Sequence, residues 1–153
     1  MNKFCLQDID MDQVVFDARA TTKRNNVSRF IEFNEIKMNI GQGMRKDIFI
    51  APHSGYYRFS FSASTADPPT WTYYTEVQVK KNWNPIFNIV DFSHEYANNL
   101  SKTWIWKMNE GDKLQFYVTK TNSDYNYLQS SKGSPIIFTG ELLYRQDFPD
   151  AKP

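Results

Sequence analysis

The most regular feature of the chain is an alternation of apolar and polar residues with a period of two. Between residues 55 and 63 one face carries Tyr57, Phe59, Phe61 and Ala63, with polar residues and Tyr56 between them. Such alternation is typical of β-strands with one buried face. It recurs at 72–80, 103–108, 114–119 and 135–144. Weaker runs predict further strands at 13–18, 29–36, 46–51 and 86–91. No segment shows a sustained apolar stripe of helical period.

Turn-forming residues separate these segments. Proline, glycine, asparagine and aspartate gather at 52–55, 67–69, 82–85, 109–112 and 132–135. These residue types supply the backbone angles and local hydrogen bonds that tight turns need. The sequence therefore predicts an all-β domain of about eight to ten short strands, arranged as a β-sandwich or jelly roll.

The inward phase of the predicted strands gives an expected core. It consists of large aromatic side chains: Tyr57, Phe59, Phe61, Trp106, Phe116 and Phe138. Gly140 lies inside a predicted strand, which indicates a bulge or a close approach of another backbone. A chain of 153 residues has the length of one domain. We expect that domain at residues 14–145, between an N-terminal arm (1–13) and a C-terminal tail (146–153).

Composition supports this class and narrows the partners. The 4 Trp, 9 Tyr and 12 Phe residues favour pleated, half-buried surfaces. A net charge of +1 argues against an electrostatic footprint for nucleic acid or for an anionic membrane surface. The single cysteine, Cys5, cannot close an internal disulfide and is compatible with a cytosolic or a secreted chain. Met1 to Leu6 is too short an apolar start for a signal peptide, so secretion would require a signal outside this sequence.

Motifs for catalysis are missing from the sequence. There is no Gly-x-Ser-x-Gly elbow, no P-loop and no Cys–His pair with a plausible spacing. Two histidines are too few for a typical zinc site. A two-carboxylate glycosidase remains an alternative, but Glu76 and Glu141 lie on strands that we do not expect to be neighbours. The sequence therefore predicts a protein that is not an enzyme.

The order of several short motifs resembles a known family. The chain carries Val15-Phe16-Asp17-Ala18, Ile31-Glu32-Phe33-Asn34, Phe49-Ile50-Ala51-Pro52, Gly55-Tyr56-Tyr57-Arg58-Phe59, Met108-Asn109-Glu110-Gly111-Asp112-Lys113-Leu114 and Phe138-Thr139-Gly140-Glu141-Leu142-Leu143-Tyr144. In this order and spacing they resemble the globular head domain of complement C1q over residues 14–144. Lys80-Lys81-Asn82 falls where that family usually has a Lys-Asn-Gly hairpin, and Asn84 and Pro85 depart from it. The collagen-like stalk common in the family is absent from this sequence.

The resemblance implies a fold and a class of function. The fold would be a ten-strand jelly roll with the topology of tumour necrosis factor. The chain would act as a non-catalytic homotrimer that recognises extracellular glycan or protein ligands, as lectin-like proteins of invertebrate innate immunity do. Two other functions stay open beside the enzyme. One is a trimeric cytokine-like ligand of a cell-surface receptor, and the other is a C1q-like domain in a larger cytoplasmic protein associated with RNA.

The outward phase of the strands predicts where copies of the chain would meet. A lone sandwich should be polar there, yet this phase includes Tyr56, Tyr117, Ile137 and Leu143. An exposed apolar patch normally marks an interface. In the topology that the resemblance implies, we expect these four residues on neighbouring strands of one sheet, around the threefold axis.

Three aromatic residues in predicted loops are candidates for ligand binding. They are Trp71, Trp83 and Tyr125. Ring faces beside polar side chains suit sugar or protein recognition, although the same rings could instead cap the ends of the core. The resemblance also implies a calcium site near the threefold axis, with Asp91 and Asn98 as oxygen ligands. Calcium takes six to eight oxygens, and the alternative is a solvated loop.

Overall fold

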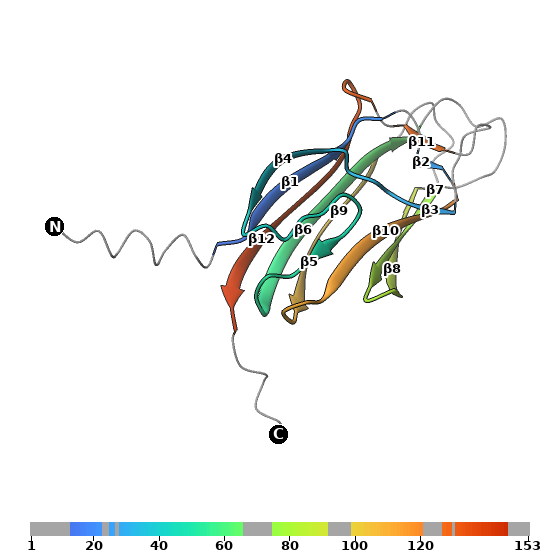
Figure 1. Cartoon of the computed structure of the whole chain (residues 1–153). Helices are drawn as coiled ribbons and strands as arrows, with labels where there is room; N and C mark the ends of the chain where they lie inside the picture. The colour runs from blue at the N-terminus through green and yellow to red at the C-terminus, as the bar shows by residue number, and fades with distance from the viewer. Residues whose placement is uncertain are drawn as a thin grey trace.

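The chain folds as two antiparallel β-sheets packed face to face (Figure 1). The structure is a computed structural model, and it describes residues 13–22, 25–26, 28–65, 75–91, 99–120, 127–129 and 131–146. Every strand pair in these segments is antiparallel. The all-β sandwich predicted from the alternation is confirmed.

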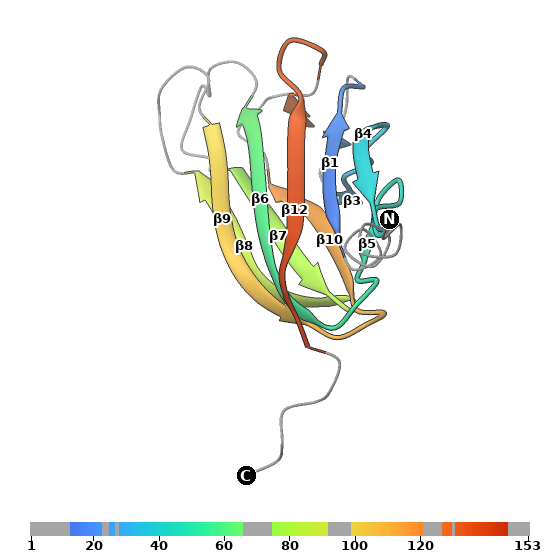
Figure 2. The same cartoon turned by 90° about the vertical axis from the view of Figure 1, so that its left-hand side faces the viewer.

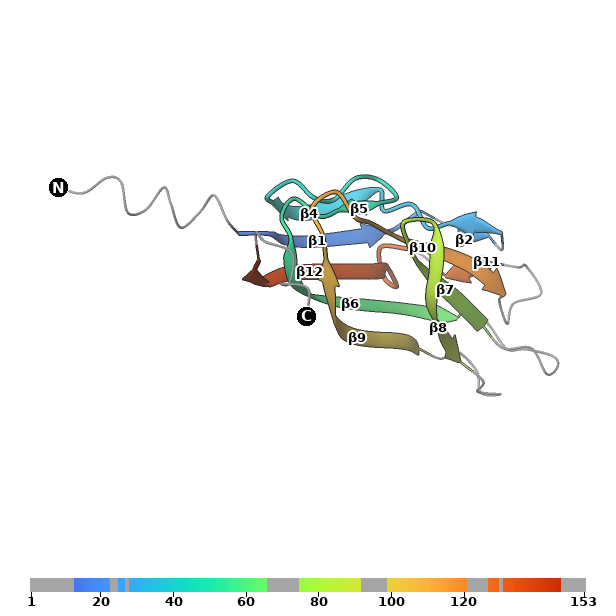
Figure 3. The same ribbon diagram turned by 90° about the horizontal axis from the view of Figure 1, so that it is seen from below.

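The first sheet has seven strands. Its members are β1 (Val15–Ala20), β2 (Asn25–Asn26), β4 (Glu35–Ile40), β6 (Gly55–Thr65), β9 (Asn99–Met108), β11 (Tyr127–Gln129) and β12 (Ile136–Arg145). The order is β2-β11-β6-β12-β1-β4, with β9 also paired to β6. Figure 3 shows the succession β4, β1, β12, β6 and β9 from below.

The second sheet has five strands. Its members are β3 (Arg29–Phe30), β5 (Phe49–Ile50), β7 (Thr75–Lys81), β8 (Asn84–Asp91) and β10 (Lys113–Lys120). The order is β3-β10-β7-β8, with β5 also paired to β10. Apart from the short β2 and β11, which extend one end of the first sheet, the strands are the ten expected for the jelly roll.

One predicted strand, at 29–36, is divided in the structure. β3 ends at Phe30 in the five-stranded sheet, and β4 begins at Glu35 in the other sheet. Between them Ile31 and Phe33 are fully buried, and the Ile31 N–H donates to the Phe116 carbonyl at 2.9 Å. The segment alternates like a strand because its apolar residues fill the core as the chain crosses from sheet to sheet.

The core lies between the two sheets and is largely aromatic. Of the six predicted core residues, Tyr57, Phe59, Phe61, Phe116 and Phe138 are buried. Trp106 is half-buried because it lies at the edge of the sandwich, on β9, which pairs with β6 alone. At Gly140 the close neighbour is a side chain rather than the predicted backbone, since a Cβ there would collide with the ring of Phe16.

Candidate functional site

The outward face of the seven-stranded sheet is unusually apolar. Figure 2 looks onto this sheet, with β9, β6, β12, β1 and β4 side by side. Among the described residues, every exposed large hydrophobic side chain except Trp83 lies on a strand of this sheet: Ile36, Met38, Ile40, Tyr56, Ile105, Leu143 and Tyr144. Ile105 is 58% exposed and Tyr144 is 64% exposed. A sheet face next to water should instead be mainly polar.

Strand register places these side chains on one surface, except for Ile36, which lies opposite the buried Ala18. Tyr56 lies opposite Tyr144 on β12 and opposite Lys107 on β9. Ile105 lies opposite Arg58. Directly opposed residues in an antiparallel pair project from the same face of the sheet, so these apolar side chains lie beside charged ones.

A shallow hollow of about 290 Å³ lies on the same face. Its lining comes from four strands: Val15, Phe16, Asp17, Met38, Arg58, Ser60, Thr139, Gly140 and Glu141. The charges around it are paired within the chain. Arg58 forms an ion pair with Glu141 at 3.1 Å, and Arg19 forms one with Asp17 at 3.1 Å. The face is therefore apolar with locally neutralised charges.

The four predicted interface residues do not share one sheet. Tyr56, Ile137 and Leu143 belong to the seven-stranded sheet, on β6 and β12. The expectation is wrong for Tyr117, which lies on β10 in the five-stranded sheet. The outward phase of a strand does not reveal which of the two sheets the strand joins. An interface role for the other three residues stays a prediction.

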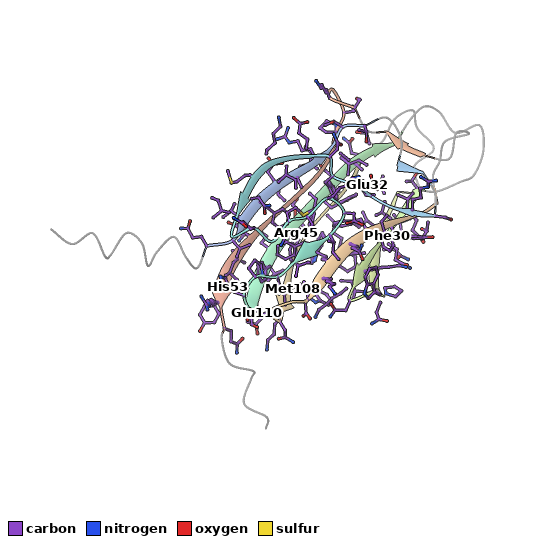
Figure 4. The ribbon with its side chains drawn as sticks, viewed as in Figure 1. Phe30, Glu32, Arg45, His53, Met108 and Glu110 are labelled. Atoms are coloured by element: carbon purple, nitrogen blue, oxygen red, sulfur yellow. The ribbon has the colours of Figure 1, made fainter. Side chains whose placement is uncertain are left out.

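Tyr117 belongs to a second surface, which we call the aromatic cluster: Phe30, Lys80, Trp83 and Tyr117. The Phe30 ring packs edge-on against Tyr117 and Trp83, with centroid distances of 5.1 and 6.2 Å. The Lys80 ammonium lies 4.4 Å from the Tyr117 centroid and 5.5 Å from that of Phe30. Figure 4 marks Phe30 beside β10. The cluster lies on the outward face of the five-stranded sheet.

Trp83 occupies a two-residue turn between β7 and β8. Its φ is +71°, and that of the preceding Asn82 is +50°. Positive φ at both central residues is characteristic of the type I′ hairpin turn, which favours Asn-Gly. Trp83 is 59% exposed. A large side chain therefore stands in water at a position where the backbone favours glycine.

The turn is held by hydrogen bonds to the neighbouring hairpin. The Asn82 amide donates to Asp112 Oδ1 at 2.9 Å, and the Lys113 N–H donates to Asn82 Oδ1 at 2.9 Å. Burial by itself raises the pKa of the Asp112 carboxyl. Hydrogen bonds from Asn82 and the Asn109 N–H, together with the Lys81 ammonium, outweigh burial and lower this pKa from its ordinary value of 3.8.

We expect the Asp112→Asn variant to be less stable than the wild type at neutral pH. The lowered pKa means that the carboxylate stabilises the fold above the unfolded value of 3.8, and that this contribution is lost as the pH falls through the folded value. The difference in urea midpoint between wild type and variant should therefore narrow from pH 7 to about pH 3. Glu110→Gln, at an exposed acid of the same turn, is the control. A difference that stays constant with pH would contradict this role.

Other candidate residues are described in part or lie outside the described segments. Trp71, Tyr125 and Asn98 lie outside them, and Asp91 is placed as the last residue of β8 without its side chain. Within the described segments no group of three or more His, Cys, Asp or Glu residues could hold a metal ion. Calcium binding stays a prediction, to be tested by comparing melting curves with calcium and with chelator.

The carboxylates considered for glycoside hydrolysis are on different sheets. Glu76 lies on β7 and accepts a hydrogen bond from Thr119 at 2.7 Å. Glu141 lies on β12 and pairs with Arg58. This agrees with the expectation that their strands are not neighbours. No helix in the described segments is long and apolar enough to span a membrane.

Comparisons with known proteins agree with this architecture. The sequence model of the C1q domain matches residues 15–143. The globular domain of zebrafish complement 1qA superposes with a TM-score of 0.68 at 17% identity, covering 88% of this chain and all of that one. No curated protein matches by sequence.

Two further solved structures share the fold. Murine APRIL gives a TM-score of 0.64 at 14% identity, covering 86% of this chain and 100% of its own. The Eiger TNF of S. frugiperda gives 0.64 at 9% identity, covering 92% and 99%. The jelly-roll topology expected from the motifs is thereby confirmed.

Proposed function

Because the chain belongs to the C1q domain family, we propose that it is a non-catalytic binding module that works as an extracellular homotrimer. The copies meet through the outward face of the seven-stranded sheet. We call this surface the assembly face and define it by Met38, Ile40, Tyr56, Ile105, Ile137 and Leu143. Its ligand is a glycan or a protein.

The apolar character of the assembly face is the observation that carries the proposal. Large apolar side chains project from four of its strands, where an isolated sandwich would expose polar ones. Contiguous exposed apolar surface of this kind marks an interaction site. Burying it against a second copy removes it from water, which is the main favourable term in association.

The charges on the assembly face support a second copy as the occupant. Identical surfaces that meet around an axis bring identical charges together, and unpaired like charges would repel. Here Arg58 is paired with Glu141, and Arg19 with Asp17, inside each copy. The net charge of +1 per chain adds little long-range repulsion. The protruding Ile105 and the hollow beside Met38 offer unlike surfaces, as a closed ring of heterologous contacts requires.

Such an assembly leaves the five-stranded sheet facing outward in each copy. The aromatic cluster then stays accessible on each of the three copies. Several weak sites on one particle bind a repetitive surface far more tightly than one site does. This gain links the oligomer to the binding function, and it suits a ligand that is displayed in many copies, such as a glycan coat.

A glycan array tests this function. We expect the purified protein to bind a subset of arrayed glycans, and a variant that cannot assemble to bind the same glycans much more weakly because avidity is lost. A trimer that binds no glycan would favour the cytokine-like alternative, a protein ligand on a cell surface. Equal binding by the monomeric variant would contradict the proposed purpose of the assembly.

A further inference from the structure

We propose that the aromatic cluster is a binding site for an anionic saccharide. The ring of Trp83 stacks on the apolar face of a sugar, and the Lys80 ammonium binds the carboxylate or sulfate group of that sugar. This inference rests on the proposed binding function for its context, but the site is complete within one chain and does not need the assembly.

The backbone at Trp83 supports a role for this side chain outside the fold. A non-glycine residue at φ +71° is strained, and strain of this kind persists where surrounding structure holds it, most often at functional sites. The surrounding structure is the set of hydrogen bonds between Asn82 and the β9–β10 turn. The Trp83 side chain contributes little buried surface to the fold, because it is 59% exposed. A ring fixed in water is preorganised for stacking.

Lys80 supplies the charge that selects an anion. Three other lysines form ion pairs with acidic side chains: Lys37 with Glu35, Lys46 with Glu32 and Lys81 with Asp112. Within the described segments Lys80 instead contacts the rings of Tyr117 and Phe30 alone. The cation–π contact orients the ammonium without neutralising it. An anionic ligand would neutralise the charge of the Lys80 ammonium.

Two amides on the same sheet face as the rings suit the hydroxyl groups of a sugar. Gln78 lies opposite Tyr117 on one side and opposite Asn88 on the other, so all three project from the outward face. Within the described part of the chain, neither amide side chain makes a hydrogen bond that would occupy it. Each offers both donors and an acceptor. Rings, amides and one cation together match the apolar face, hydroxyls and acid group of an anionic sugar better than they match an acidic peptide.

Calorimetric titration of the full chain with four probes tests the site. The probes are a sulfated heparin hexasaccharide, hexagalacturonate, neutral cellohexaose and hexaglutamate. We expect at least one anionic saccharide to bind about tenfold or more tightly than cellohexaose and hexaglutamate. Failure of both anionic saccharides to bind, or equal binding of cellohexaose, would overturn the proposal. Equal binding of hexaglutamate would overturn the saccharide assignment and indicate an acidic protein ligand instead.

Matched variants locate the binding. Trp83→Ala should weaken binding about tenfold or more, and Trp83→Phe should keep most of it. Lys80→Gln should abolish the preference for the anionic sugar. Lys102→Gln is the control, because Lys102 also lies over a ring, 4.7 Å from the Phe87 centroid, but on β9 of the other sheet. Unchanged binding in Trp83→Ala, or an equal loss in Lys102→Gln, would overturn the assignment.

Trp83→Gly separates this role from a structural one. Glycine relieves the strain of the turn, so the melting temperature should rise by about 2–4 °C while saccharide binding is lost. A lower melting temperature would show that the tryptophan serves the fold, which contradicts the inference. Sedimentation of each variant keeps the two proposals apart. If the unmodified protein is a trimer that does not bind the saccharides, this site is refuted and the assembly is not. If it is a monomer that binds them, the assembly is refuted and this site is not.

Discussion

Replacing Phe59 by alanine is expected to lower the free energy of unfolding by about 3–5 kcal/mol. The Phe59 side chain is fully buried. Its ring lies within 5.5 to 6.5 Å, centroid to centroid, of five other rings: Phe16, Phe49, Tyr57, Trp104 and Phe138. These rings come from both sheets, so the cavity left by the substitution opens at the centre of the sandwich. Dense packing around it limits collapse of the cavity.

Urea denaturation at a fixed protein concentration measures this loss. Phe87→Ala is the matched control, because the Phe87 ring is half-buried at the edge of the sandwich against Trp104. The free energy of unfolding should fall clearly less in Phe87→Ala than in Phe59→Ala. An unchanged midpoint in Phe59→Ala would mean that the inward phase of β6 is assigned to the wrong face.

The double substitution Met38→Asp and Ile105→Asp is expected to convert the proposed trimer into monomers. It places two charges on the assembly face of each copy, six in the trimer. Carboxylates buried without partners are strongly unfavourable, and charges close to an axis also repel one another. Both side chains are exposed in the single chain, so the fold of the monomer should survive.

The matched control is Gln78→Glu with Asn88→Asp. It adds the same two charges per copy to the outward face of the five-stranded sheet, where we expect no contact between copies. Cross-linking followed by electrophoresis distinguishes the two proteins. Loss of the trimer band in both variants would point to a general charge effect, and its retention in the first variant would remove the assembly face from the interface.

The alternation predicted the strands that have one buried face. β6, β7, β10 and β12 follow it because hydrophobic burial selects every second side chain along them. It did not predict β4 (Glu35–Ile40), of which only the first two residues fall inside the predicted strand at 29–36. There Met38 and Ile40 form the apolar phase, yet both are exposed on the edge strand. A pattern rule cannot distinguish apolar residues that fill a core from those that another copy would cover.

Sheet membership was beyond the reach of local patterns. Tyr117 has the outward phase that the alternation predicted, but long-range pairing of β10 with β3 and β7 decides that it faces away from the assembly face. Trp83 was recognisable as a turn residue, but the sequence left open whether its ring would be exposed or would cap the core. Lys80 lies on β7, which leads directly into this turn, but Phe30 on β3 and Tyr117 on β10 are distant in sequence. Only the folded topology brings these two rings to Trp83.

Sedimentation equilibrium of the unmodified protein tests whether copies of the chain assemble through the apolar face of the seven-stranded sheet. We expect one species at micromolar concentration with three times the mass of the 18.0 kDa chain. A single species of 18.0 kDa under those conditions would contradict it.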